Sequence, residues 1–170
     1  MQCPTCSSDL LEFVGGDGAR FFNCWLCGEA EATVSPRPSM PVTYMKFAKL
    51  MSRRSTCAQR SVGAVITSAD FEQVYSVGYN GNAKGRINGC DGLGWKDSCG
   101  CIHAEMNALI KCSTKDITKV MFITLAPCSL CAKMMVNSGF SLVYYAEDWK
   151  SADGLKILRE AGIKVIKLPL

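Results

Sequence analysis

The residues of this chain best suited to chemistry are its one histidine and a nearby pair of cysteines. His103 stands two positions before Glu105, and Cys128 and Cys131 follow in a Pro-Cys-x-x-Cys segment. One imidazole and two thiolates form a zinc ligand set that leaves the fourth position open for water. A glutamate beside that water can move protons without binding the metal. The spacing therefore predicts a zinc centre that activates water for a hydrolysis.

The same residue order, His-x-Glu followed by Pro-Cys-x-x-Cys, is the pattern of zinc-dependent nucleobase deaminases. A structural zinc site is the alternative, but such a site fills all four positions with protein ligands and needs no glutamate. We therefore interpret His103, Cys128 and Cys131 as catalytic zinc ligands and Glu105 as the group that transfers protons.

A helix is expected to begin at the histidine. Residues 104–110 are strong helix formers, so His103 and Glu105 would lie at the first turn. The apolar and β-branched residues 120–124 predict a short buried strand that follows this helix.

A second helix is expected to open at Pro127, because a proline at the first helical position loses no hydrogen bond. Cys128 and Cys131 would then share one face of this helix. The partial positive charge at its N-terminus would favour their thiolate forms. A helix–strand–helix unit would thus bring three ligands to one metal.

The remaining pattern predicts a three-layer α-β-α domain with a five-stranded mixed sheet. Apolar residues recur with helical spacing at Tyr44, Phe47, Ala48 and Met51. The other expected elements are strands at 62–66, 73–77, 142–146 and 164–166, the first two forming a hairpin, and a helix at 154–161 that stops at Gly162.

Residues 1–34 form a separate unit with two Cys-x-x-Cys pairs, Cys3 with Cys6 and Cys24 with Cys27. This is close to the pattern of a four-cysteine zinc ribbon, and so short a unit needs a metal in order to fold. A thioredoxin-like redox pair is the alternative. Residues 35–42 are expected to be a proline-rich linker, and residues 43–170 the catalytic domain.

Composition favours a cytoplasmic protein with no membrane span. The chain has 170 residues, 48% of them hydrophobic, and no apolar run approaches the length of a membrane helix. Its N-terminus lacks the basic and apolar regions of a secretion signal. The 11 cysteines occur mostly in close pairs, which indicates metal binding in a reducing compartment rather than a disulfide scaffold.

Several segments resemble the deoxycytidylate deaminase family, within the cytidine deaminase-like fold. They are residues 57–66 (Cys-Ala-Gln-Arg-Ser-Val-Gly-Ala-Val-Ile), 78–81 (Gly-Tyr-Asn-Gly), 88–91 (Asn-Gly-Cys-Asp) and the two zinc segments described above. The resemblance covers residues 43 to about 168 and excludes the N-terminal ribbon.

The resemblance implies several substrate contacts. Asn80 would contact the deoxyribose hydroxyl, and the backbone N–H of Ala104 would hold the pyrimidine carbonyl. Trp149 would lie on the substrate side, although a partly buried core aromatic is an equal alternative. A homo-oligomer and regulation by a nucleotide triphosphate effector are further implications.

Two departures from the family pattern leave the phosphate ligand open. Ala83 replaces a common proline, and Thr114 stands where some members carry a basic residue. Lys84, Arg86 and Lys133 are candidates on charge alone, and each is equally compatible with a solvated surface position.

The resemblance also implies a third, structural zinc. Family members of this type bind it through cysteines that match Cys57 and Cys90, together with residues just before the catalytic histidine, here Cys99 and Cys101. Independent buried thiols are the alternative. Cys112 is left over and is expected in the core.

The resemblance implies hydrolytic deamination of dCMP to dUMP and ammonia. The alternatives are deamination of a cytosine or adenine base within single-stranded nucleic acid or RNA, deamination of a modified cytosine nucleotide, and a non-catalytic, zinc-stapled regulatory or interaction protein. The formal charge of +4 would fall to near zero if ten cysteines bound three zinc ions as thiolates, which argues against nucleic acid as a partner. An intact Glu105 argues against the non-catalytic alternative.

Overall fold

The protein consists of two compact units, Met1–Pro38 and Ser39–Leu170. The computed structural model describes residues 7–14, 20–24, 26–27, 30–32, 38–93, 99–116 and 118–170. None of the helices in these ranges is both long and apolar enough to cross a membrane.

The first unit contains a three-stranded antiparallel sheet in the order β1-β2-β3. Its strands are β1 (Leu10–Val14), β2 (Arg20–Cys24) and β3 (Ala30–Ala32). Cys24 is buried at the end of β2, and Cys27 is exposed in the turn that follows. Cys3 and Cys6 lie outside the described residues.

The second unit has the element order predicted from the sequence, and its five strands form a mixed sheet in the order β5-β4-β6-β7-β8. β4 pairs antiparallel with β5 and β6, while the β6–β7 and β7–β8 pairs are parallel. The elements are α1 (Met40–Ser52), β4 (Gly63–Thr67), β5 (Val74–Tyr79), α2 (Ala104–Lys111), β6 (Lys119–Leu125), α3 (Ser129–Asn137), β7 (Phe140–Glu147), α4 (Asp153–Glu160) and β8 (Lys164–Lys167).

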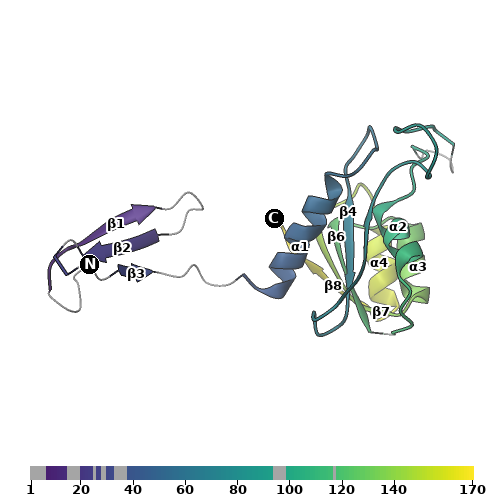
Figure 1. Ribbon diagram of the computed structural model, residues 1–170. Helices are drawn as coiled ribbons and strands as arrows, with labels where there is room; N and C mark the ends of the chain where they lie inside the picture. The colour runs from purple at the N-terminus through teal and green to yellow at the C-terminus, as the bar shows by residue number, and fades with distance from the viewer. Residues whose placement is uncertain are drawn as a thin grey trace. The chain divides into compact units, whose positions relative to one another are not determined.

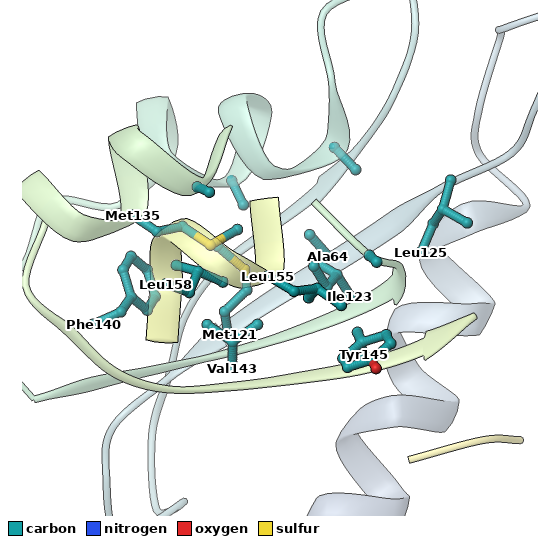
Figure 2. Packing of buried hydrophobic residues seen from close by; sticks show 14 of the residues in the cluster. Ala64, Met121, Ile123, Leu125, Met135, Phe140, Val143, Tyr145, Leu155 and Leu158 are labelled. Atoms are coloured by element: carbon teal, nitrogen blue, oxygen red, sulfur yellow. The ribbon is translucent and has the colours of Figure 1, made fainter. Parts of the chain in front are cut away.

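Helices cover both faces of this sheet, which confirms the three-layer fold. α1 packs on one face, and α2, α3 and α4 pack on the other (Figure 1). Successive side chains of a strand point to opposite faces. On β6, Phe122 accordingly packs with Tyr44 of α1, while Met121 joins Val143 and Leu158 on the opposite side (Figure 2). Every residue of β6 is buried, so this central strand anchors both layers.

Two helix starts near prolines differ from those expected. α1 begins at Met40, inside the range predicted as linker, and Pro41 is its second residue. A proline fits there because first-turn N–H groups have no intrahelical partner. The expectation that Pro127 opens a helix was wrong: α3 begins at Ser129, with Cys128 as its N-cap.

α2 lies unusually close to β5. The Asn107 side chain donates a hydrogen bond to the carbonyl of Tyr79 at 2.9 Å, and the Ser76 hydroxyl donates to the carbonyl of Ala108 at 2.8 Å. Gly78 lies between these contacts, and a Cβ atom there would meet the carbonyl oxygen of Ala104 at 2.1 Å. The absence of a side chain at Gly78 therefore allows the first turn of α2 to pack against the sheet.

We predict that Gly78→Ala destabilises the catalytic unit strongly. The added methyl meets backbone atoms, which no rotamer change can relieve, and overpacking of this kind costs about 1–3 kcal/mol or more. Ser76→Ala faces the same helix but only removes one hydrogen bond, at a cost of about 1 kcal/mol. Thermal unfolding followed by fluorescence compares the two variants. A Gly78→Ala midpoint equal to that of the wild type would contradict the close packing.

Candidate active site and metal centres

The N-termini of α2 and α3 bring one histidine and two cysteines together. His103 is the N-cap of α2, Cys128 is the N-cap of α3, and Cys131 lies one turn into α3. The Nδ1 atom of His103 is 3.5 Å from the Cys128 sulfur and 3.4 Å from the Cys131 sulfur. The three predicted zinc ligands thus form one group, named here the His–Cys–Cys cluster.

The donor separations in the His–Cys–Cys cluster fit a tetrahedral zinc ion. Zn–N and Zn–S bonds of about 2.0 and 2.3 Å at tetrahedral angles place a nitrogen and a sulfur donor about 3.5 Å apart. The observed separations are 3.4 and 3.5 Å. Three donors leave one tetrahedral position for a ligand from solution.

Glu105 lies next to the His–Cys–Cys cluster, in the first turn of α2. Its side chain is only 4% exposed, and it lines the same cavity as His103 and Cys128. Burial raises the pKa of the Glu105 carboxyl above its usual range. A buried carboxyl group with a raised pKa is suited to both accepting and donating a proton near neutral pH.

The two sulfurs of the His–Cys–Cys cluster have opposite electrostatic environments. The hydrogen bond from the Cys131 thiol, followed by the interaction with His103, lowers the pKa of Cys128 to about 4. The pKa of Cys131 is raised, because its proton is shared with the Cys128 thiolate and its side chain is buried. A divalent cation at this point would favour the thiolate form of both cysteines.

The cavity of the site lies at one end of the strands of the sheet, where four connecting segments meet. Val62 precedes β4, Asn80 follows β5, Cys128 follows β6 and Trp149 follows β7. The strand directions place these four positions at the same end of the sheet. All four line one cavity of about 280 Å³, close to the lower limit of the about 300–1,000 Å³ typical of small-ligand pockets.

The three residues predicted to contact substrate all line this cavity. Asn80 is 6% exposed; its Nδ2 donates to the carbonyl of Arg60 at 2.7 Å, and its Oδ1 accepts from the N–H of Val62 at 2.8 Å. Ala104 is the first residue of α2, where backbone N–H groups have no intrahelical partner. Trp149 is half-buried against the main core and also lines the cavity. It is therefore both a partly buried core aromatic and a residue on the substrate side.

A second group of donors, the four-cysteine cluster, consists of Cys57, Cys90, Cys99 and Cys101. Their sulfurs all lie within 4.8 Å of one another. The separations are 3.5 Å for Cys57–Cys90, 3.7 Å for Cys57–Cys99 and 3.8 Å for Cys90–Cys101. Four sulfurs bound to one zinc at about 2.3 Å lie about 3.8 Å apart, so these donors also fit a tetrahedral ion.

The four-cysteine cluster forms part of the cavity wall. Cys57 and Cys99 line the cavity, and Cys101 stands two positions before His103. Burial acts to raise the pKa of Cys57, but hydrogen bonds from the backbone of Arg60 and Gln59 lower it to about 7. Cys112, expected in the core, is instead the half-buried C-cap of α2, packed against the main core and outside this cluster.

The cations on the cavity differ from those proposed from the sequence. Lys84, Arg86 and Lys133 are exposed and do not line it, and Arg86 pairs with Asp91 at 3.2 Å. Arg60 and Lys150 line it instead. Their positions in the sequence could have indicated this, because Arg60 lies within the family-like segment 57–66 and Lys150 follows Trp149. The sequence analysis did not identify either residue as part of the cavity.

Comparison with known proteins identifies the family. A family model described as the cytidine and deoxycytidylate deaminase zinc-binding region matches residues 39–147. ComE operon protein 2 of Bacillus subtilis is 35% identical over 136 residues, which cover 75% of this chain and 70% of that protein. Deoxycytidylate deaminase of Saccharomyces cerevisiae is 33% identical over 141 residues, covering 76% of this chain but only 45% of the yeast enzyme.

A solved structure supports the same family assignment. The dCMP deaminase of cyanophage S-TIM5, crystallised in complex with dCMP and dUMP, is 31% identical and superimposes with a TM-score of 0.69. The match covers 79% of this chain and 100% of the cyanophage chain. The protein therefore belongs to the cytidine and deoxycytidylate deaminase family, and the resemblance stated from its motifs is confirmed.

Proposed function

We propose that this enzyme catalyses the hydrolytic deamination of dCMP to dUMP and ammonia. The observation that supports this most directly is the single cavity containing the His–Cys–Cys cluster and Glu105. It occurs in a chain that matches the whole length of a cyanophage enzyme crystallised with dCMP and dUMP. The cavity suits one nucleotide better than a polymer strand, because its volume is only about 280 Å³.

His103, Cys128 and Cys131 would hold the catalytic zinc. A zinc ion bound there would act as a Lewis acid that makes a water molecule acidic near neutral pH. The N-termini of α2 and α3 both point their partial positive charges at the site. This field stabilises the two thiolates, so the protein itself contributes to the binding of the cation.

Glu105 would transfer the protons of the reaction. As a carboxylate it accepts a proton from the attacking water, and as a carboxylic acid it donates one to the ring nitrogen beside the carbon under attack. Transfer of the second proton of that water, from the added hydroxyl group to the amino group, then allows the C–N bond to break and ammonia to depart. Burial of Glu105 limits exchange of these protons with bulk water.

Asn80, Ala104 and Trp149 would orient the nucleotide. The N–H of Ala104, at the start of α2, would donate to the pyrimidine carbonyl. One Nδ2 hydrogen of Asn80 is held by Arg60, which leaves the other for a deoxyribose hydroxyl. Trp149 presents an aromatic surface to the cavity.

The four-cysteine cluster would hold a structural zinc ion. Its donor separations and the backbone hydrogen bonds to Cys57 support metal binding rather than a set of independent thiols. Four closely spaced thiols also favour a reducing compartment, because an oxidising one would convert them into disulfides. Cytoplasmic location is accordingly part of the proposal.

The N-terminal unit would bind a further zinc ion through Cys3, Cys6, Cys24 and Cys27. The proposal also includes assembly into a homo-oligomer, which light scattering tests. It includes regulation by nucleoside triphosphates as well, which is tested by titrating the deaminase reaction with each triphosphate. The alternative is deamination of a base within single-stranded nucleic acid, because zinc ribbons can bind nucleic acid. Deletion of the ribbon tests this alternative, as described below.

Glu105→Gln is expected to keep the fold and the zinc content but to lower turnover of dCMP by at least about 10²-fold, because an amide cannot transfer the protons. Glu160→Gln, on the exposed face of α4, is the matched control and is expected to retain full turnover. Ammonia release is measured at equal zinc content. Wild-type turnover in the Glu105 variant would remove this residue from the mechanism.

Cys90→Ser is expected to lower the zinc content by one ion per chain and to destabilise the protein strongly, because three thiolates would lose their counter-ion. Cys112→Ser, which alters a half-buried thiol outside both clusters, is expected to keep the wild-type zinc content. Elemental analysis and thermal unfolding are the measurements. Equal zinc contents in the two variants would argue for independent thiols at the four-cysteine cluster.

Deletion of residues 1–38 is expected to leave turnover of free dCMP within about tenfold of the full chain, or about 1.4 kcal/mol. Every proposed substrate contact lies in the unit that begins at Ser39. An enzyme that grips a strand through the ribbon would instead act on oligonucleotides, lose affinity on truncation and depend steeply on salt. Both substrates are assayed at low and moderate salt, with the oligomer size of each protein checked by light scattering.

A further inference from the structure

The first turn of α4 packs against the start of α3 with no room for a side chain between them. Gly154 is the second residue of α4, and it is buried. A Cβ atom there would lie 1.9 Å from the carbonyl oxygen of Pro127, 2.8 Å from the Pro127 carbonyl carbon and 3.1 Å from that of Cys128. All three are backbone atoms, which no rotamer change can move aside. The peptide that links Pro127 to Cys128 is therefore packed directly against the backbone of α4.

The position of this peptide determines where the two sulfur donors lie. Cys128 is the N-cap of α3 and a member of the His–Cys–Cys cluster. Its sulfur accepts a hydrogen bond from the N–H of Cys131 at 3.5 Å, and its carbonyl accepts one from the N–H of Ala132 at 2.9 Å. These bonds join Cys128 to the first turn of α3. A displacement of the Pro127–Cys128 peptide therefore moves both sulfurs relative to His103, which belongs to α2.

α4 is anchored along its length, so it cannot withdraw freely from this contact. Leu155 and Leu158 are buried in the main core (Figure 2). At the C-terminal end of the helix, the N–H of Ile163 donates to the carbonyl of Leu158 at 3.0 Å, and β8 follows at once and pairs with β7. A helix held in this way transmits volume added at Gly154 to the neighbouring peptide.

A metal centre tolerates little displacement of its donors. The Nδ1 atom of His103 lies 3.5 and 3.4 Å from the two sulfurs, which fits zinc. Metal–donor distances stay within about 0.2 Å of their ideal values. A Cβ atom at 1.9 Å from an oxygen must move away by about 1.5 Å to reach the 3.4 Å of an ordinary contact. A small part of this shift, passed to Cys128, exceeds the tolerance of the metal.

We propose that Gly154 is a positioning residue for the catalytic centre. Because it lacks a side chain, α4 sets the place of Cys128 and thereby the distance of the two sulfurs from His103. This inference rests on the proposed zinc site at the His–Cys–Cys cluster. Gly78 acts on α2 in the same way, since a Cβ atom there would meet the carbonyl oxygen of Ala104, the residue after His103. Each of the two helix starts is thus positioned by one glycine of a neighbouring element.

Gly63 supplies a matched control. A Cβ atom at Gly63, the first residue of β4, would meet the carbonyl oxygen of Ala48 at 2.0 Å and the backbone nitrogen of Ser52 at 2.6 Å. The clash is as severe as at Gly154, but it involves α1, which covers the opposite face of the sheet from α2 and α3 (Figure 1). Gly154→Ala and Gly63→Ala are therefore both expected to lower the midpoint of thermal unfolding, and only Gly154→Ala to weaken metal binding at the His–Cys–Cys cluster.

The test measures how firmly the cluster holds its ion. The chelator 1,10-phenanthroline reaches zinc through an open coordination position, which three protein ligands leave and four do not. Zinc loss per chain is followed against chelator concentration, and the ion of the cluster is assigned by its absence from Cys131→Ser. Gly154→Ala is expected to release this ion at a chelator concentration at least about tenfold below that of the wild type, the usual effect of losing a residue that orients a ligand. Gly63→Ala is expected to release it at the wild-type concentration. The visible spectrum of the cobalt-refilled protein is expected to change only in Gly154→Ala.

A milder pair of variants decides the test if either alanine variant fails to fold. The Ser151 hydroxyl donates to the carboxylate of Asp153 at 2.7 Å and accepts from its N–H at 3.1 Å, which holds the first turn of α4. The Ser138 hydroxyl donates to the carbonyl of Met134 at 2.7 Å, at the far end of α3. Ser151→Ala loosens the turn that contains Gly154 and is expected to release the ion at a chelator concentration about two- to fivefold lower. Ser138→Ala is expected to match the wild type.

The outcomes separate positioning from stability and from the proposed zinc site. Equal chelator sensitivity of Gly154→Ala and Gly63→Ala would overturn the positioning role while leaving the zinc site intact. Where one of these two does not fold, equal sensitivity of Ser151→Ala and Ser138→Ala would overturn it instead. If the wild type and Cys131→Ser hold the same number of zinc ions, the His–Cys–Cys cluster binds none. The proposed catalytic site would then be wrong, and the positioning role with it.

Discussion

The separation of about 3.5 Å between one imidazole nitrogen and two sulfurs is the constraint on which the rest of the structure depends. No single helix supplies these donors, so α2 and α3 must begin side by side. The sheet makes this arrangement possible. α2 is held against β5 by the close approach at Gly78, and α3 follows directly from the fully buried strand β6. An error of one ångström in either helix would take a donor out of range of a common ion.

The segment between Cys57 and Val62 connects the four-cysteine cluster with the rim of the cavity that holds the His–Cys–Cys cluster. It begins with a member of the four-cysteine cluster, continues to Arg60 and ends where β4 starts. Asn80 holds the end of this segment through two hydrogen bonds, and Cys101 of the four-cysteine cluster stands two positions before His103. A metal bound by the four cysteines would therefore stabilise the walls of the cavity from two sides. This explains physically why a structural ion would lie so close to the reacting groups.

The cavity combines opposite electrostatic requirements. Proton transfer needs a buried carboxyl group with a raised pKa, as at Glu105, and this requires exclusion of water. Arg60 and Lys150, by contrast, are exposed cations on the same cavity. The fold separates these charges along one cavity: the helix N-termini form the buried end, and the loops after β7 and before β4 form the rim.

The sequence by itself determined the element order and predicted which donor side chains come together in the two clusters. Strong periodicity defines elements such as β6, and the His103, Cys128 and Cys131 spacing is a local signal tied to two helix starts. The helix boundaries did not follow from the sequence in the same way. α3 begins at Ser129 rather than at Pro127, because capping depends on local backbone geometry. Only the tertiary structure identified Arg60 and Lys150 as cavity residues. Isolated surface charges have no periodicity or fixed spacing. These two line the same cavity because β4 begins and β7 finishes at the same end of the sheet, although the strands are far apart in sequence.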